Sequence, residues 1–183
     1  MDGFIKLLAR LLAEGGIPDS IIHRKQRIEL PGFFRPTKEW DLLVIADGQL
    51  LASIELKSHV GPSFSNNYNN RTEEAVGNAT DFWTAYREGA FSHSPRPWLG
   101  YLMLLEETKG STRPVKIAEP HFKVLEEFRG ASYAERYRQL CRKLVRERLY
   151  DAACFLLSSS PGGRRGRYSE PDVRSLNFVP DFL

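Results

Sequence analysis

Hydrophobic residues recur at helical spacing at the start of this chain and at strand spacing further on. An amphipathic helix ending at Gly15-Gly16 is predicted by apolar residues three and four positions apart, namely Phe4, Leu7, Leu8, Leu11 and Leu12. The weak alternation over residues 21–30 predicts a strand. The pairs Pro31-Gly32 and Arg35-Pro36 then predict a break in regular structure.

Two nearly continuous apolar runs, Asp41–Ala46 and Gln49–Lys57, flank an Asp47-Gly48 turn signal. They predict a β-hairpin that is central in a sheet and covered on both faces. Residues 61–70 contain a glycine, a proline and four asparagines, which predict a loop. Asn70 with Glu73 then predicts a capping box that opens a helix ending near Gly89.

The second half of the chain predicts a strand over 98–105, a helix opened by a capping box of Ser132 and Glu135, and a buried strand over 152–157. The order of elements predicts an α/β fold with a mixed central sheet flanked by helices. With 183 residues and 42% hydrophobic content, the chain is long enough for one domain spanning 1–183.

Composition excludes several classes of protein. No apolar run approaches the roughly 18 residues of a membrane span, and Lys6, Arg10 and Glu14 interrupt the leucine-rich start, unlike a signal peptide. The two cysteines, Cys141 and Cys154, are too few for a disulfide framework or a zinc site, which favours a reducing cytoplasm. A net charge of +3 permits binding to a polyanion without requiring it.

Three charged residues in the predicted hairpin carry candidate chemistry. Glu55 and Lys57 are two positions apart, so they share a face of the strand. Asp41 joins them only in one register, because a two-residue turn in a regular ladder places it opposite Ile54. We therefore predict either a three-residue connection with Gly48 in a left-handed conformation or a bulge. Either one pairs Asp41 with Ser53 or Glu55.

In that register, Asp41 and Glu55 supply hard oxygen ligands for Mg²⁺, joined by the backbone carbonyl of Leu56. Lys57 would orient a metal-bound water or stabilise a pentacoordinate phosphorus. Such a site would hydrolyse phosphodiesters. The alternative interpretation is a set of edge-strand charges or one cross-strand ion pair. The apolar flanks favour a metal site, since charge between Ile54 and Leu56 is costly unless it is compensated.

Several stretches around these residues resemble the XhoI-like type II restriction endonucleases of the PD-(D/E)xK nuclease superfamily. They are residues 30–38 (LPGFFRPTK), Asp41 with Glu55-Leu56-Lys57, 69–75 (NNRTEEA), 83–91 (WTAYREGAF), 97–101 (PWLGY) and 144–152 (LVRERLYDA). The resemblance covers roughly the whole chain. Trp40 departs from the proline of the superfamily motif. The chain also begins later than members of the family, so we expect that an N-terminal helical segment is missing.

The resemblance implies Mg²⁺-dependent cleavage of both strands of palindromic CTCGAG DNA to 5′-phosphate ends, with Asp41, Glu55 and Lys57 in the catalytic positions. It also implies a cognate DNA methyltransferase that protects the host. Symmetric cleavage needs two active sites, so a homodimer is expected. The alternatives are another PD-(D/E)xK nuclease of repair or resolvase type, and a truncated, inactive DNA-binding fragment.

Polar side chains that can read base edges follow the candidate catalytic strand directly. We predict DNA contacts from Asn66, Asn67, Asn69, Asn70 and Arg71, and from Arg164 and Arg165 in a glycine-rich loop. An asparagine-rich turn without a DNA contact is the alternative for the first group. Arg71 and Glu74 could instead support the metal site from outside, and Glu29 is a second additional carboxylate. We interpret Glu29 and Glu74 as solvated charges.

Two further sets of residues have less specific patterns. The histidines show no metal-ligand spacing, and we interpret His59, near the end of a strand, as polar surface. The helix predicted after Ser132 is strongly basic, with Arg136, Arg138, Arg142, Lys143, Arg146 and Arg148. It either attracts phosphate or is a solvated face that pairs with Glu135 and Glu147.

Overall fold

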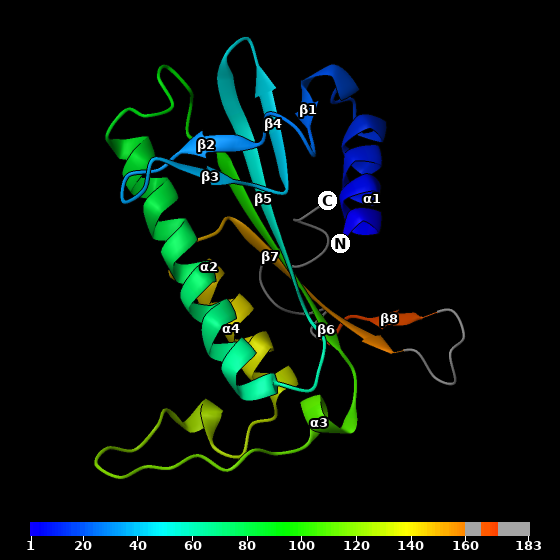
Figure 1. The fold of residues 1–183 in the computed structure, drawn as a ribbon, viewed down its shortest axis with the longest axis vertical. Helices are drawn as coiled ribbons and strands as arrows, with labels where there is room; N and C mark the ends of the chain where they lie inside the picture. The colour runs from blue at the N-terminus through cyan, green and yellow to red at the C-terminus, as the bar shows by residue number, and fades with distance from the viewer. Residues whose placement is uncertain (160–165, 172–183) are drawn as a thin grey trace.

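A six-stranded mixed sheet forms the centre of the molecule, and helices cover both of its faces (Figure 1). The computed structural model describes residues 1–159 and 166–171. The strand order is β1 (Ile22–His23), β4 (Leu42–Ala46), β5 (Gln49–His59), β6 (Trp98–Glu106), β7 (Ala152–Ser159) and β8 (Arg167–Ser169). Strands β5, β6 and β7 are parallel, and the remaining pairs are antiparallel. The predicted mixed sheet flanked by helices is therefore confirmed.

The helices divide between the two faces. Helix α1 (Asp2–Glu14) covers one face, where its Leu8 packs in a cluster with Leu42, Ile54 and Leu56. Helices α2 (Phe64–Arg87) and α4 (Tyr133–Arg146) cover the other face, where the core is rich in aromatic side chains. Short elements complete the fold: β2 (Glu29–Pro31), β3 (Thr37–Glu39), α3 (Lys109–Thr112) and 3₁₀ turns at Asp19–Ile21 and Glu126–Phe128.

A bulge sets the register of the central hairpin. Ala46 pairs with Gln49 across a two-residue turn, whose Asp47 and Gly48 both have positive φ, 50° and 75°. The register then shifts between Val44 and Ile45, because Leu51 has no partner on β4, and Leu42 pairs with Ile54. Of the two predicted solutions, the bulge is therefore confirmed and the three-residue connection is wrong. The next residues outward, Asp41 and Glu55, are level with each other.

The bulge gives a prediction for two single-residue deletions. Deleting Leu51 should leave a regular ladder with the same pairing, so Asp41 stays level with Glu55 and the DNA cleavage that the sequence resemblance implies should stay within about threefold of wild type. Deleting Ile45 while Leu51 stays unpaired instead brings Asp41 level with Ile54 and turns its side chain to the other face, so cleavage is lost. Plasmid cleavage by both folded variants tests this. Equal loss of activity in the two would contradict it.

Two segments differ from the sequence prediction. Residues 21–30 form no continuous strand: Lys25 and Arg27 adopt left-handed conformations, φ 72° and 54°, and divide β1 from β2. The predicted asparagine-rich loop is also wrong, because α2 begins at Phe64 with Ser63 as its N-cap. The capping box predicted from Asn70 and Glu73 therefore lies inside this helix.

Aromatic packing explains the early start of α2. Phe64 stacks on Tyr133, with ring centroids 5.7 Å apart, and Tyr68 meets Tyr137 at 5.1 Å. These two residues are four positions apart and so lie on the same face of the helix, which they attach to α4. Tertiary packing thus outweighs the weak helix propensity of the asparagines.

Candidate active site

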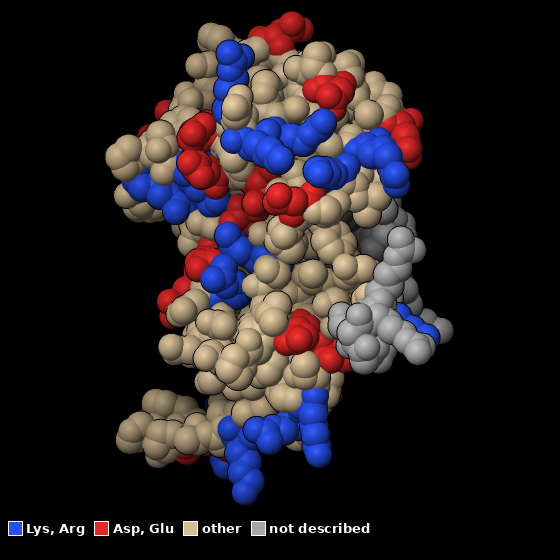
Figure 2. Space-filling model, turned by 45° about the vertical axis from the view of Figure 1, so that its right-hand side comes forward, with Lys and Arg blue, Asp and Glu red and all other residues tan. Residues whose placement is uncertain are grey.

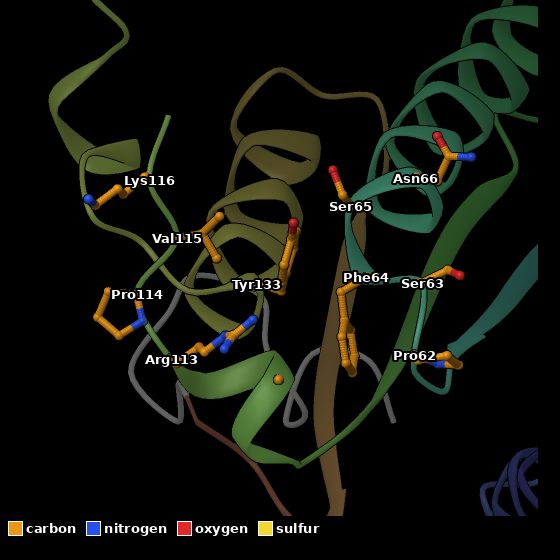
Figure 3. Close-up of a pocket in the computed structure, with 11 residues that line it drawn as sticks. Pro62, Ser63, Phe64, Ser65, Asn66, Arg113, Pro114, Val115, Lys116 and Tyr133 are labelled. Carbon is orange, nitrogen blue, oxygen red and sulfur yellow. The ribbon is translucent and has the colours of Figure 1, made fainter. Parts of the chain in front are cut away.

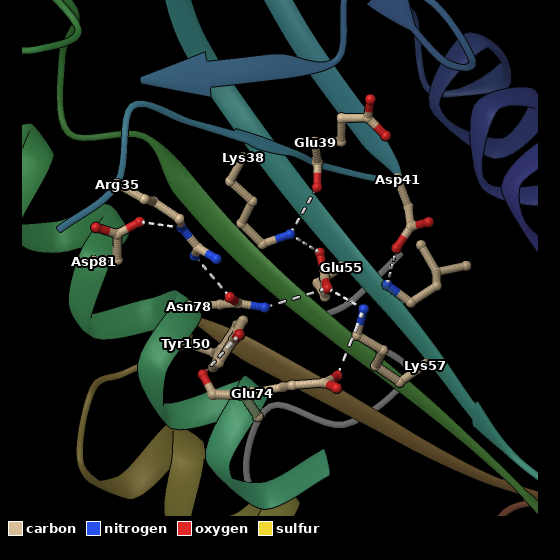
Figure 4. Close-up of polar contacts among 12 residues, drawn as sticks. Arg35, Lys38, Glu39, Asp41, Glu55, Lys57, Glu74, Asn78, Asp81 and Tyr150 are labelled. Carbon is tan, nitrogen blue, oxygen red and sulfur yellow. Dashed lines mark hydrogen bonds and ion pairs between the residues drawn. The ribbon is translucent and has the colours of Figure 1, made fainter. Parts of the chain in front are cut away.

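Glu55 is the centre of a charged cluster on the face of the sheet that α2 covers (Figure 4). Its side chain is only 1% exposed, yet it lies close to two ammonium groups. Lys38 Nζ lies 2.7 Å from Glu55 Oε2, and Lys57 Nζ lies 2.5 Å from Oε1. Asn78 Nδ2 on α2 donates a longer bond to Oε1, at 3.4 Å. These partners compensate a carboxylate that would otherwise be costly to bury.

Asp41 extends the cluster along the same edge of the hairpin. Its Oδ2 accepts the backbone N–H of Leu56 at 2.7 Å. Burial raises the pKa of Asp41 above its ordinary value, against the hydrogen bond from Leu56, and the charge of nearby Glu55 raises it further. A cation placed beside Asp41 would therefore stabilise the ionised form of its carboxylate.

Lys57 lies on the same face as Glu55 and has a second carboxylate within reach. Its ammonium is 3.9 Å from Glu74 Oε2, and Arg71 donates to the same oxygen at 2.7 Å. Glu74 and Arg71, both on α2, therefore contact the cluster from outside, and the Glu74 side chain is also 40% exposed. Glu29 is exposed on β2 and pairs across that hairpin with Glu39.

The donor set at Asp41 and Glu55 fits a small hard cation. Among the residues that the structure describes, no group of three or more His, Cys, Asp or Glu side chains could hold a metal ion. Mg²⁺ does not need such a cage, because it is usually held by one or two carboxylates while water and substrate oxygens fill the remaining positions. The carboxylates of Asp41 and Glu55 meet that requirement.

Sequence reasoning gave Lys38 no role. This lysine lies on β3, and besides its ion pair with Glu55 it donates to the Glu39 carbonyl at 2.7 Å. Its Nζ also lies 4.2 Å from the centre of the Trp40 ring. Burial lowers the pKa of Lys38, although Glu55 opposes that shift. Lys38 is 17 residues from Glu55 in the sequence. The only feature of the sequence that could have pointed to Lys38 as a site residue is its position three residues before Asp41.

The predicted DNA-binding residues fall in two places. Arg71 and the four asparagines lie on the first turns of α2, where Asn66, Asn69 and Asn70 are exposed and Asn67 is half-buried. Arg164 and Arg165 lie outside the described residues. Figure 2 shows basic and acidic side chains interleaved over the upper half of the face it presents, so no single sign of charge dominates there.

An open pocket of about 810 Å³ lies at the N-terminal end of α2 (Figure 3). Phe64, Ser65 and Asn66 line one side of it, and Arg113 and Lys116 line the other. The exposed Asn66 therefore faces a hollow with basic side chains across from it. Basic side chains beside Asn66 are compatible with its predicted role, which is to contact base edges of DNA.

Two other predictions have clear outcomes. His59 is only 2% exposed and its Nδ1 lies 2.8 Å from the Tyr137 hydroxyl, so the surface interpretation is wrong. Burial lowers the pKa of His59. On α4, Lys143 pairs with Glu127 at 2.8 Å and Arg146 with Glu147 at 3.1 Å. These pairs favour a solvated, salt-bridged face for that helix. Both cysteines are buried, and neither is in a disulfide.

Paired carboxylates and a lysine on one face of a mixed sheet are typical of metal-dependent phosphodiesterases. The chain belongs to the restriction endonuclease XhoI family, whose model matches residues 1–170. No solved structure matches the chain. Among the described residues, none of the helices combines the length and apolar character needed to cross a membrane.

Three curated relatives are type II restriction enzymes. BstVI of Geobacillus stearothermophilus is 54% identical over 190 residues, covering 100% of this chain and 85% of the relative. XhoI of Xanthomonas vasicola is 49% identical over 147 residues, covering 79% of this chain and 59% of the relative. AbrI of Azospirillum brasilense is 55% identical over 124 residues, covering 67% of this chain and 56% of the relative. The chain thus spans between about half and most of the length of these relatives.

Proposed function

We propose that this protein is a type II restriction endonuclease that cleaves both strands of palindromic DNA in the presence of Mg²⁺. The supporting observation is the bulged hairpin, which brings Asp41 level with Glu55 and leaves Lys57 on the same face. The proposed recognition sequence is CTCGAG, in line with the similarity to XhoI over 79% of the chain. The mixed sheet with this cluster would be the PD-(D/E)xK core of a single nuclease domain spanning 1–183.

In the proposed mechanism, Asp41, Glu55 and the Leu56 carbonyl would hold the metal ion. Mg²⁺ held there would supply positive charge beside the scissile phosphate and would acidify a coordinated water. Asp41 Oδ2 is fixed by the Leu56 N–H, which orients its carboxylate. Lys57 carries its positive charge on the same face, where it would orient the attacking water and stabilise negative charge that develops on the phosphate oxygens.

The remaining parts of the proposal concern recognition and assembly. The exposed asparagines of α2 would read base edges, and Arg164 and Arg165 would contact the DNA backbone. Two copies of the chain would form a symmetric dimer, each reading one half of the palindrome. A cognate methyltransferase would protect the host DNA, and the enzyme would act in the cytoplasm, where the thiols of Cys141 and Cys154 would remain reduced.

The test uses two plasmids that differ only in one CTCGAG site, each incubated with the protein and Mg²⁺ or with EDTA. We expect Mg²⁺-dependent linearisation of the plasmid that has the site, and sequencing of the ends should show 5′-phosphates within CTCGAG. Equal cutting of both plasmids would favour another PD-(D/E)xK nuclease. Salt-sensitive DNA binding without cutting would favour an inactive DNA-binding fragment.

A further inference from the structure

We propose that Lys38 is a resident cation of the active site: it keeps Glu55 Oε2 occupied when a divalent ion binds, while Lys57 moves from Oε1 toward Glu74. This inference rests on the proposed function only in placing a divalent ion at Asp41 and Glu55. It adds a second lysine to the site and gives the two lysines different tasks.

Lys38 is fixed by its surroundings on several sides. Its side chain is 10% exposed, and its ammonium contacts Glu55 Oε2, the Glu39 carbonyl and the face of Trp40. Because the lysine donates to both oxygens at 2.7 Å, withdrawing it would take a donor from the buried Glu55 Oε2 and from the Glu39 carbonyl. Lys38 is therefore the costlier of the two lysines to displace.

The β2–β3 hairpin that presents Lys38 is itself attached to α2. Asp81 on α2 accepts the backbone N–H groups of Phe33 and Phe34 at 2.8 Å each, and Arg35 Nε at 2.8 Å. Arg35 also donates to Asn78 Oδ1 at 2.8 Å, and Asn78 in turn contacts Glu55. The same helix thus positions the hairpin with its lysine and contacts the carboxylate that the lysine neutralises (Figure 4).

Lys57 has the opposite character. Its side chain is 24% exposed, more than twice the value for Lys38, and it already lies 3.9 Å from a second carboxylate, Glu74. Glu74 is held by Arg71 at 2.7 Å, so this alternative acceptor has a fixed position. A short movement of the Lys57 ammonium from Glu55 to Glu74 would therefore replace one ion pair with another.

The balance of charge explains why one lysine must move. Without a metal ion, Asp41 and Glu55 are matched by Lys38 and Lys57. A divalent cation adds two positive charges, and like charges within a few ångströms of each other in a poorly solvated site repel strongly. Moving Lys57 toward Glu74 and the phosphate of the substrate reduces this repulsion and opens Oε1 to the metal. Since Oε2 remains with Lys38, Glu55 would bind one divalent ion.

Calorimetric titration with Mg²⁺ in the absence of DNA tests the proposal on the folded, full-length chain. Lys38→Met removes the ammonium at nearly constant length, and we expect Mg²⁺ to bind about tenfold more tightly because a competing cation is gone. Lys6→Met makes the same change in net charge on exposed α1, across the sheet, and should leave affinity within about twofold. Lys38→Gln replaces Lys38→Met if the latter does not fold.

The direction of the change separates this role from a merely structural one. A lysine that only stabilised the fold would lower Mg²⁺ affinity when replaced, because the ligands would lose their arrangement. Unchanged or weaker Mg²⁺ binding by the folded Lys38 variant would overturn the proposal. Tighter binding by a protein that does not cut CTCGAG would leave it standing and refute the proposed function. Normal cutting of CTCGAG by the protein, together with unchanged Mg²⁺ affinity in the Lys38 variant, would overturn the role of Lys38 and support the proposed function.

Adjacent glutamates test the second half of the proposal. Glu74→Gln removes the carboxylate that receives Lys57, so we expect Mg²⁺ affinity to fall by about fivefold. Glu73→Gln makes the same charge change on the exposed neighbouring residue and should have an effect of less than about twofold. Equal losses in both variants would show that general charge, and not an acceptor for Lys57, controls the binding of the ion.

Discussion

Replacing Asp41 with asparagine is expected to reduce DNA cleavage at least about 1000-fold while leaving the fold as stable as before. Asparagine keeps an oxygen that can accept the Leu56 N–H but has no charge for a metal ion. Burial already raises the pKa of Asp41, so its ionised form weakens the folded state at neutral pH. The free energy of unfolding should therefore stay the same or rise.

Two measurements on the same preparation check this prediction: single-turnover cleavage of a CTCGAG duplex and denaturation by urea. The matched control is Asp47→Asn, which makes the same substitution at the exposed turn of the same hairpin. That variant should cleave at the wild-type rate. Retained cleavage by the Asp41 variant would remove Asp41 from the proposed metal site.

Replacing Glu55 with glutamine should remove both activity and stability. Cleavage should again fall at least about 1000-fold, because a metal ligand is lost. In contrast to Asp41, Glu55 is the partner of two ammonium groups and is 1% exposed. Losing its charge leaves Lys38 and Lys57 without their shared anion, so we expect the free energy of unfolding to fall by about 3 kcal/mol.

Chemical denaturation of the Glu55→Gln variant measures that loss, and circular dichroism at low temperature establishes that the protein is folded when cleavage is assayed. Combining Glu55→Gln with Lys38→Met should recover part of the stability, because the second change removes one of the unpaired cations. A Glu55 variant as stable as wild type would contradict the ion-pair arrangement around this carboxylate. One that still cleaved DNA would contradict its place in the mechanism.

The sequence was sufficient to predict the sheet, its flanking helices and the face shared by Glu55 and Lys57, because these features follow from local periodicity. It also showed that a regular two-residue hairpin could not bring Asp41 to that face. The structure achieves this with a bulge at the unpaired Leu51. The sequence could not distinguish that bulge from a longer turn, because either one places Asp41 on the same face of the sheet as Glu55.

Contacts between distant segments account for what the sequence did not predict. Asparagine favours turns, so residues 64–70 resembled a loop until the packing of Phe64 and Tyr68 on α4 extended the helix over them. Lys38 was assigned no role, because its partner lies in a different strand of a different sheet. His59 was misplaced for the same reason, since Tyr137 is 78 residues away.

The most direct measurement is a crystal structure of the protein with a CTCGAG duplex and Ca²⁺ in place of Mg²⁺. We expect a cation within about 2.3–2.6 Å of carboxylate oxygens from both Asp41 and Glu55 and of the Leu56 carbonyl, with a DNA phosphate completing its coordination. A cation bound away from these residues, or DNA whose phosphates do not approach Asp41 and Lys57, would contradict it.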